Sequence, residues 1–158
     1  MSSPIEKLVG PTLLRGKTEV PTAEALAGKK IVMIYFSAHW CPPCRGYTPQ
    51  LASTYSSSTK LDEVEIIFVS SDQDQAAFDG YHGEMPWLAL PYSDRAAKDK
   101  LSELYGVRGI PTLVVLNADG TVVTTGGRGK ESTWLGGGGG GGGDSSGGGN
   151  TGSGCVIL

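Results

Sequence analysis

The pattern of apolar and polar residues contains two continuous apolar runs, "IVMIYF" at 31–36 and "VEIIFVS" at 64–70. Runs of this length between polar segments are typical of strands buried in the centre of a sheet. Between them, Tyr47 and Leu51 recur at the spacing of one helix face, so we predict a helix over residues 41–58. The first half of the chain therefore alternates strand, helix and strand.

The second half of the chain continues this alternation. Residues 74–81 predict a short helix and "WLALPY" at 87–92 a weaker strand. A helix period with a cap at Ser93 or Asp94 then runs to Gly106. The segment at 112–125 has two strand-like halves around "NADG", a hairpin signal. We predict an α/β fold with a central mixed sheet, helices on both faces and a C-terminal β-hairpin.

Composition divides the 158 residues into three parts. Residues 1–135 have an ordinary globular composition and the length of one domain. Residues 136–154 are almost all Gly, Ser, Asn and Thr, which predicts a disordered linker, and residues 155–158 form a terminal "CVIL". The net charge of −3 without a basic cluster argues against a nucleic-acid partner. No signal peptide pattern begins the chain, so we expect a cytoplasmic, reducing location.

The candidate chemistry lies in "WCPPCR" at 40–45. Cys41 falls where a strand ends and a helix begins, and unpaired N–H groups and the helix dipole favour a thiolate there. Pro42 and Pro43 fit the first turn and stiffen it. Cys44 lies one turn inside the helix, where we expect it to be less exposed and less ionised. Attack by Cys41 on a disulfide, followed by attack of Cys44 on the mixed disulfide, is the sequence of events that we predict.

Two structural alternatives to redox exchange, a metal site and a static disulfide, remain open at this point. A zinc site needs four ligands, and the chain offers Cys41, Cys44, Cys155, His39 and His82 without a second ligand pair. A static structural disulfide is uncommon in a reducing compartment. We expect no metal and no cofactor beyond the Cys41–Cys44 disulfide, with His39 a solvated neighbour and His82 a surface residue.

Two tryptophans and one proline complete the residue-based predictions. Trp40 precedes the first cysteine and forms either an exposed docking rim or a packing contact. Trp87 is predicted to be in the core. Pro111 begins a strand after Ile110, a normal place for proline, and sequence alone gives a cis bond there a low base rate of about 5%.

Four segments together resemble one known family. "YFSAHWCPPCRGYTP" (35–49), "MPWLALPY" (85–92), "YGVRGIPTLVVLNADG" (105–120) and "VVTT" (122–125) are similar, in order and spacing, to the tryparedoxin and nucleoredoxin branches of the thioredoxin superfamily. The resemblance covers residues 5–125 and implies a thioredoxin fold. It also implies a cis Ile110–Pro111 bond facing the dithiol, Cys41 as nucleophile and Cys44 as resolving thiol.

The resemblance assigns roles to further residues. Tyr35 stands where thioredoxins proper carry a buried aspartate, as it does in tryparedoxins. Asp72 matches an acidic residue of the tryparedoxin pattern and is the candidate for managing protons, the alternative being a cap for the helix at 74–81. Trp40 and Arg128 are the candidate substrate-binding residues.

The resemblance also implies electron donors and acceptors. Tryparedoxins take electrons from trypanothione and pass them to peroxiredoxins and glutathione-peroxidase-like enzymes, so we expect a monomeric protein-disulfide reductase with trypanothione or glutathione as donor. Ser71 and Arg108 depart from the tryparedoxin pattern, and a cation at Arg108 would repel the spermidine amines of trypanothione. The rivals are a nucleoredoxin-like binding module with little turnover and an oxidase or isomerase.

The family continues past its last strand with an arginine-bearing segment and a final helix, whereas "GGRGKESTWL" at 126–135 runs into glycine. We therefore expect that helix to be shortened or lost, with one sheet face thinly covered by Trp134 and Leu135. "CVIL" fits a geranylgeranylation box at Cys155, the alternative being an unmodified thiol. One lipid binds membranes only marginally, so we expect a reversible tether to the cytosolic face of a membrane.

Overall fold

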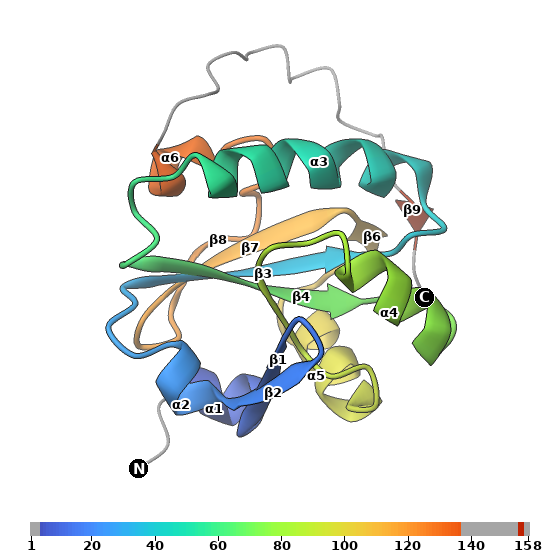
Figure 1. The fold of residues 1–158 in the computed structure, drawn as a ribbon, viewed down its shortest axis with the longest axis horizontal. Helices are drawn as coiled ribbons and strands as arrows, with labels where there is room; N and C mark the ends of the chain where they lie inside the picture. The colour runs from blue at the N-terminus through green and yellow to red at the C-terminus, as the bar shows by residue number, and fades with distance from the viewer. Residues whose placement is uncertain (1–3, 137–154, 157–158) are drawn as a thin grey trace.

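The computed structural model describes residues 4–136 and 155–156, and Figure 1 shows a sheet between two layers of helices. In chain order its elements are α1 (Pro4–Val9), β1 (Thr12–Arg15), β2 (Thr18–Pro21), α2 (Thr22–Ala25), β3 (Ile31–Ser37), α3 (Pro42–Ser56), β4 (Val64–Ser70), α4 (Gln75–His82), β5 (Leu88–Ala89), α5 (Arg95–Leu104), β6 (Gly109–Ile110), β7 (Thr112–Asn117), β8 (Val122–Thr124), α6 (Ser132–Leu135) and β9 (Cys155–Val156).

The main sheet of the described residues is mixed, with the order β2-β1-β5-β4-β3-β7-β8. β3 is paired in parallel with β4 and antiparallel with β7, so that Tyr35 lies between Phe68 and Leu113. β8 closes the far edge as the second strand of a hairpin with β7. The predicted fold class and the predicted hairpin are confirmed.

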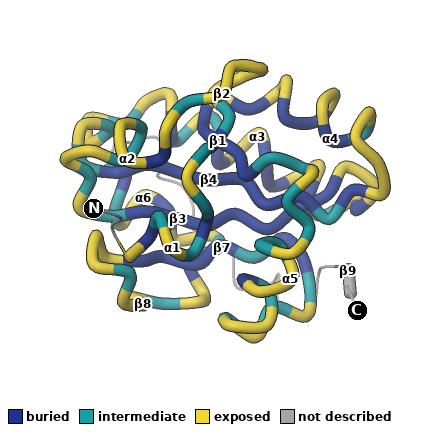
Figure 2. Tube along the Cα trace, turned by 90° about the horizontal axis from the view of Figure 1, so that it is seen from below, coloured by how far each residue is buried: buried dark blue, intermediate teal, exposed yellow. Residues whose placement is uncertain are grey.

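Two apolar clusters cover the two faces of this sheet, because successive side chains of a strand point to opposite sides. Val32, Ile34 and Phe36 of β3 belong to the cluster that contains residues of α1 and α5. Met33 and Tyr35 belong to the opposite cluster, which contains residues of α3, α4 and α6. Strands β3, β4 and β7 are accordingly buried along most of their length (Figure 2).

The predicted helices begin and end close to where the sequence signals place them. Asp94 caps α5, because its carboxylate accepts the N–H of Ala97 at 3.1 Å. Gly106 follows the helix with a φ of +66°, a left-handed conformation that glycine adopts without strain. Asp74 caps α4 by accepting the N–H of Ala77 at 2.8 Å. The cap of this helix is therefore Asp74, and the alternative prediction that Asp72 caps it is wrong.

Two regions differ from the sequence-based expectations. The strand expected at 87–92 is reduced to Leu88–Ala89, since Pro86 and Pro91 bracket it and proline cannot donate to a ladder. The strands β1 and β2 and the short helices α1 and α2 were not predicted, because their apolar residues are few and alternate over only four residues in each strand. β1 nevertheless extends the sheet by pairing with β5.

The segment after β8 contains one short helix, as the glycine-rich sequence led us to expect. α6 has four residues; its Leu135 is fully buried, and Trp134 is half-buried against the same cluster. The predicted linker at 136–154 lies outside the described residues apart from Gly136. Among the helices described, none is both long and apolar enough to cross a bilayer.

Candidate active site

Cys41 occupies the cap position at the start of α3, four residues after β3 ends at Ser37. Pro42 and Pro43 have no N–H, and the N–H groups of Cys44 and Arg45 both donate to the carbonyl oxygen of Cys41, at 2.9 and 3.1 Å. The expectation that unpaired N–H groups of the first turn face the sulfur is therefore wrong. The electrostatic support for a thiolate at Cys41 comes from the dipole of this 15-residue helix.

The sulfur of Cys41 faces the loop between α5 and β7. Its Sγ lies 3.7 Å from the carbonyl oxygen of Ile110, and the Ile110–Pro111 peptide bond is cis. The expectation of a cis bond that faces the dithiol is confirmed. Cys41 and Ile110, about 70 positions apart in the chain, thus lie on opposite sides of the site.

Cys41 is joined by a disulfide to Cys155, with 6.0 Å between the two Cα atoms, whereas Cys44 is free. This pairing differs from the predicted Cys41–Cys44 disulfide. Both Cys41 and Cys44 are fully buried, so the expectation that Cys41 is the more exposed of the two is wrong for this form. The strand that carries Cys155, β9, is paired with β6, and the two lie near each other in Figure 1.

Cys44 lies beneath Cys41, at the first turn of α3. Burial raises the pKa of the Cys44 thiol, and hydrogen bonding to Ser37 and to the Ala38 backbone opposes this increase. The Arg128 guanidinium also lowers the pKa of Cys44, and the Asp72 carboxylate raises it. Cys44 is therefore kept as a protonated, shielded thiol, which suits a second rather than a first nucleophile.

Buried hydroxyl groups form a continuous chain next to Cys44. Tyr35 and Tyr81 each bond the Thr48 hydroxyl at 2.6 Å, and Tyr81 also bonds the Ser37 hydroxyl at 2.8 Å. The Tyr81 hydroxyl is 3.4 Å from the carbonyl oxygen of Cys44. Burial raises the pKa of Tyr35 far above its usual value, so this hydroxyl stays neutral in the place of a buried carboxylate.

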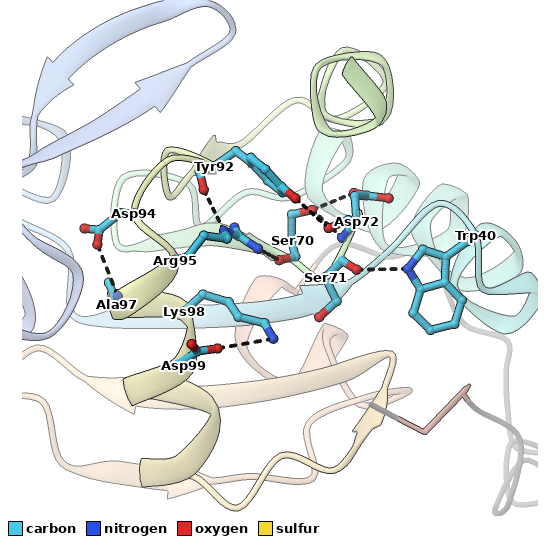
Figure 3. Close-up of polar contacts among 10 residues, drawn as sticks. All are labelled: Trp40, Ser70, Ser71, Asp72, Tyr92, Asp94, Arg95, Ala97, Lys98 and Asp99. Atoms are coloured by element: carbon cyan, nitrogen blue, oxygen red, sulfur yellow. Dashed lines mark hydrogen bonds and ion pairs between the residues drawn. The ribbon is translucent and has the colours of Figure 1, made fainter. Parts of the chain in front are cut away.

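Asp72 holds the backbone that leads into the site. Its carboxylate accepts the N–H of His39 at 2.8 Å and the hydroxyl of Ser70 at 2.6 Å. Figure 3 shows Asp72 beside Ser70, with the guanidinium of Arg95 donating to the Ser70 carbonyl from the other side. Asp72 thus orients the residues just before Cys41, and its role in proton transfer stays a prediction.

Trp40 is the exposed apolar residue of the site. Its side chain is 40% exposed, and its indole N–H donates to the Ser71 carbonyl at 2.9 Å (Figure 3). An anchored but exposed ring can contact a partner without a large loss of side-chain entropy. Of the two readings of Trp40, the structure places the ring at the surface and not in the core.

Arg128 lies on the segment after β8, close enough for its charge to lower the pKa of Cys44. Its guanidinium is 5.9 Å from the centre of the Tyr47 ring, and the Gly129 N–H donates to the Tyr47 hydroxyl at 3.2 Å. The same hydroxyl donates to the buried Glu131 carboxylate at 2.5 Å. These contacts fix the segment to α3 and keep a positive charge near Cys44.

A family model described as thioredoxin-like matches residues 28–122, most of the region that contains this site. The chain belongs to the thioredoxin-like family. Mouse nucleoredoxin is 45% identical to it over 126 residues, 79% of this chain and 29% of that protein. Tryparedoxin of Trypanosoma brucei brucei is 42% identical over 129 residues, 81% of this chain and 89% of that protein.

A solved structure of tryparedoxin II in complex with glutathionylspermidine has a TM-score of 0.77 to this chain at 37% identity, and the match covers 83% of this chain and 92% of that one. This thioredoxin-like chain spans about 30% of the length of the animal nucleoredoxins that it matches and about 20% of the plant ones. Together these likenesses place the chain with the tryparedoxins and nucleoredoxins of the thioredoxin-like family.

Two predictions about single residues have clear outcomes. His82 was expected at the surface but is buried, its ring stacked on Phe78 and its Nε2 3.0 Å from the Trp87 carbonyl oxygen. A histidine on the inner side of a short helix was misassigned because it is polar. Trp87 is fully buried, as predicted, and His39 is exposed, also as predicted.

The sequence did not reveal the hydroxyl groups of Ser37, Thr48 and Tyr81 as part of the site. Their signal is geometric: Ser37 follows Tyr35 on the same face of β3, and Thr48 lies one helical turn after Cys44. Only Tyr81 had no local signal, since α4 comes from a distant part of the chain. Within residues 4–136 and 155–156, no group of three or more His, Cys, Asp or Glu side chains is arranged to hold a metal ion.

Proposed function

We propose that this thioredoxin-like chain is a protein-disulfide reductase in which Cys41 attacks and Cys44 resolves. The observation that carries the proposal is the contrast between the two sulfurs. Cys41 lies at the start of a long helix, beside the cis-proline loop, where a second sulfur already bonds to it. Cys44 is buried, free and held as a thiol by its surroundings.

The proposed reaction is a pair of thiol–disulfide exchanges. The Cys41 thiolate attacks one sulfur of a substrate disulfide, which releases the other substrate sulfur as a thiolate. Cys44 loses its proton and attacks the Cys41 sulfur of the mixed disulfide, so that the second substrate sulfur leaves. The products are a reduced substrate and a Cys41–Cys44 disulfide, which a donor dithiol reduces again.

We also propose a low-molecular-weight thiol such as trypanothione or glutathione as the donor, and peroxiredoxin-type or glutathione-peroxidase-like disulfides as acceptors. A glutathionylspermidine complex of a related tryparedoxin supports a donor of this class. Arg108, which is exposed next to β6, disfavours cationic donors by charge repulsion. Trypanothione, glutathione and a thioredoxin reductase system should therefore be compared as donors, with insulin as the acceptor.

A nucleoredoxin-like binding module is the second candidate function. It is favoured by the exposed, anchored Trp40 and by the 45% identity to mouse nucleoredoxin. A Cys44→Ser/Cys155→Ser variant, in which no second cysteine can release a partner bound to Cys41, separates the two functions. A trapped covalent partner, released by dithiothreitol, supports the reductase, whereas unchanged non-covalent association without trapping supports the module.

The lipid anchor at Cys155 stays a prediction, as does the cytosolic membrane face on which it would act. The sequence "CVIL" supports it, and residues 157–158 lie outside the described part of the chain. Expression of a Cys155→Ser variant tests it. A shift of this variant from membranes to the soluble fraction is expected, and an unchanged distribution would contradict the anchor.

A further inference from the structure

The C-terminal strand β9 binds the active site through its backbone as well as through its sulfur. It pairs antiparallel with β6, with Cys155 opposite Ile110 and Val156 opposite Gly109. The Cα atoms of Cys41 and Cys155 are 6.0 Å apart, within the range that disulfides prefer. A segment from the end of the chain is thus bonded to the nucleophile and paired with the strand that precedes the cis-proline; Figure 1 shows β9 near β6.

Gly109 leaves the space that this strand requires. A Cβ atom added to Gly109 would lie 3.3 Å from the carbonyl oxygen of Cys155, closer than an ordinary van der Waals contact. Cys155 is half-buried and packs against the cluster that also contains Cys41 and Ile110. Strand pairing, close backbone approach and apolar packing therefore all favour the same position of Cys155.

We propose that Cys155 is a third redox-active cysteine, which exchanges with Cys44 for the sulfur of Cys41. This inference rests on the proposed function, because substrate reduction supplies the two-electron oxidation that first makes the Cys41–Cys44 disulfide. The oxidised protein then exists as two isomers, one with the Cys41–Cys44 bond and one with the Cys41–Cys155 bond. The second isomer is the one that the structure contains.

The exchange is balanced without any further reagent. The Cys155 thiolate attacks the Cys41 sulfur, the Cys41–Cys44 bond breaks, and Cys44 leaves as a thiolate that takes up the proton given by Cys155. In the reverse direction Cys44 attacks Cys41 and releases Cys155. Neither direction changes the number of electrons in the protein.

The position of Cys155 in one chain with Cys41 favours this exchange over reaction with a free thiol. The two cysteines are 114 residues apart, but only 19 residues separate Leu135 of the folded domain from Cys155. A tether of this length holds a group at an effective concentration of about a millimolar. Pairing of β9 with β6 further favours attack on Cys41 by Cys155 over attack by a free thiol.

The consequence is a reversible self-block of the reductase. In the Cys155-bonded isomer, β9 occupies the edge of β6 beside Cys41 and obstructs the donor thiol that would reduce the oxidised chain. Because a sulfur in a disulfide cannot be alkylated, Cys155 is also withheld from any covalent attachment until Cys44 releases it. Oxidation of the domain therefore makes the Cys155 thiol unavailable to other reagents.

Peptide mapping of the full-length chain tests the bond directly. The chain is oxidised with diamide, quenched in acid, blocked with N-ethylmaleimide and digested with trypsin, which leaves Cys41 and Cys44 together in residues 31–45 and Cys155 in residues 131–158. The expected result is a cross-linked pair of these peptides with the bond at Cys41, enriched in the Cys44→Ser variant. A Cys41–Cys44 bond alone in the native chain, or disulfide-bonded dimers in place of the internal link in Cys44→Ser, would overturn the proposal.

A matched variant tests whether strand register matters. In Ser153→Cys/Cys155→Ser the same thiol on nearly the same tether is moved by two residues, out of register with Ile110. Losing even one backbone hydrogen bond should reduce the linked fraction about fivefold. An equal yield of linked peptide in this variant and in the native chain would mean that proximity alone makes the bond, and would overturn the strand-specific site.

Activity separates a failure of this inference from a failure of the proposed function. With limiting donor, Cys155→Ser should reduce insulin about twofold faster or more than the native chain, since half or more of the oxidised native chain is then blocked. Equal rates with no cross-linked peptide would end the inference and leave the reductase intact. An inactive Cys155→Ser variant beside a native chain that forms the link would end the reductase proposal instead.

Discussion

The two cysteines of the first turn of α3 lie three positions apart but in opposite surroundings. The surroundings of Cys41 are mainly backbone: it caps the helix, and the Ile110 carbonyl and the β6–β9 strand pair lie next to it. Cys44 is met by side chains, including the hydroxyl of Ser37 and the guanidinium of Arg128. Backbone groups can contact partners of many different sequences. The fixed side chains around Cys44 instead set the pKa of a single thiol. The difference explains why one sulfur can receive substrates and the other can only resolve them.

Removal of the nucleophilic sulfur, that of Cys41, should have the largest effect. We expect Cys41→Ser to lower kcat/KM for insulin reduction by about a thousandfold or more, because the other cysteine of this helical turn, Cys44, is buried and held as a thiol. The insulin turbidity assay with dithiothreitol measures it. Cys155→Ser, tested in parallel, should remain active; comparable activity in Cys41→Ser would assign the attack to another group.

Removal of the resolving sulfur should block turnover at a later step. We expect the double variant Cys44→Ser/Cys155→Ser to react once with a substrate disulfide and to lower multiple turnover about a hundredfold, since only external thiols can then release the substrate. Mass spectrometry of the denatured, non-reduced mixture should find the substrate on Cys41. Multiple turnover in this double variant as fast as in Cys155→Ser alone would contradict the role of Cys44 as the resolving thiol.

Loss of the Ser37 hydroxyl should impair Cys44 alone. Hydrogen bonding to Ser37 lowers the pKa of Cys44, so Ser37→Ala raises it and leaves less thiolate at any given pH. The decay of the mixed disulfide should be slowed about three- to tenfold near pH 7, and its pH profile should move to higher pH. Rapid-quench measurement of both exchange steps checks this; a slower first step with an unchanged second step would contradict the assignment.

Removal of the Arg128 charge should have the smallest effect. The guanidinium lowers the pKa of Cys44 from a half-buried position, where solvent screens it, so Arg128→Gln should slow resolution only about twofold. The effect should diminish as salt is added, and Arg128→Lys should retain most of the native rate. An effect of Arg128→Gln that is independent of salt would indicate a packing role against Tyr47.

The central part of the fold was predictable because its signals are local. The runs at 31–36 and 64–70 became β3 and β4, and the caps and hairpin formed where their residues required. The short elements β1, β2 and α2 were not predictable, since four residues carry too little periodicity. β1 depends on pairing with β5, a contact between distant segments.

The surroundings of Cys41 were largely predictable from the sequence, and those of Cys44 were less so. The position of Cys41 follows from the strand–helix junction, and the cis bond at Pro111 followed from family resemblance. The hydroxyl chain around Cys44 includes Tyr81 of α4, whose approach depends on tertiary packing. The bond to Cys155 depends on a strand pairing between residues 45 positions apart, which no local pattern encodes.

The most direct test of the account is the order in which the two sulfurs of the Cys155→Ser variant react. The reduced variant is treated with a limiting amount of iodoacetamide at a series of pH values, and the label within residues 31–45 is located by fragmentation. We predict label on Cys41 at lower pH and at a higher rate than on Cys44, because the helix dipole stabilises the Cys41 thiolate and burial opposes ionisation of Cys44. Equal labelling, or label first on Cys44, would contradict it.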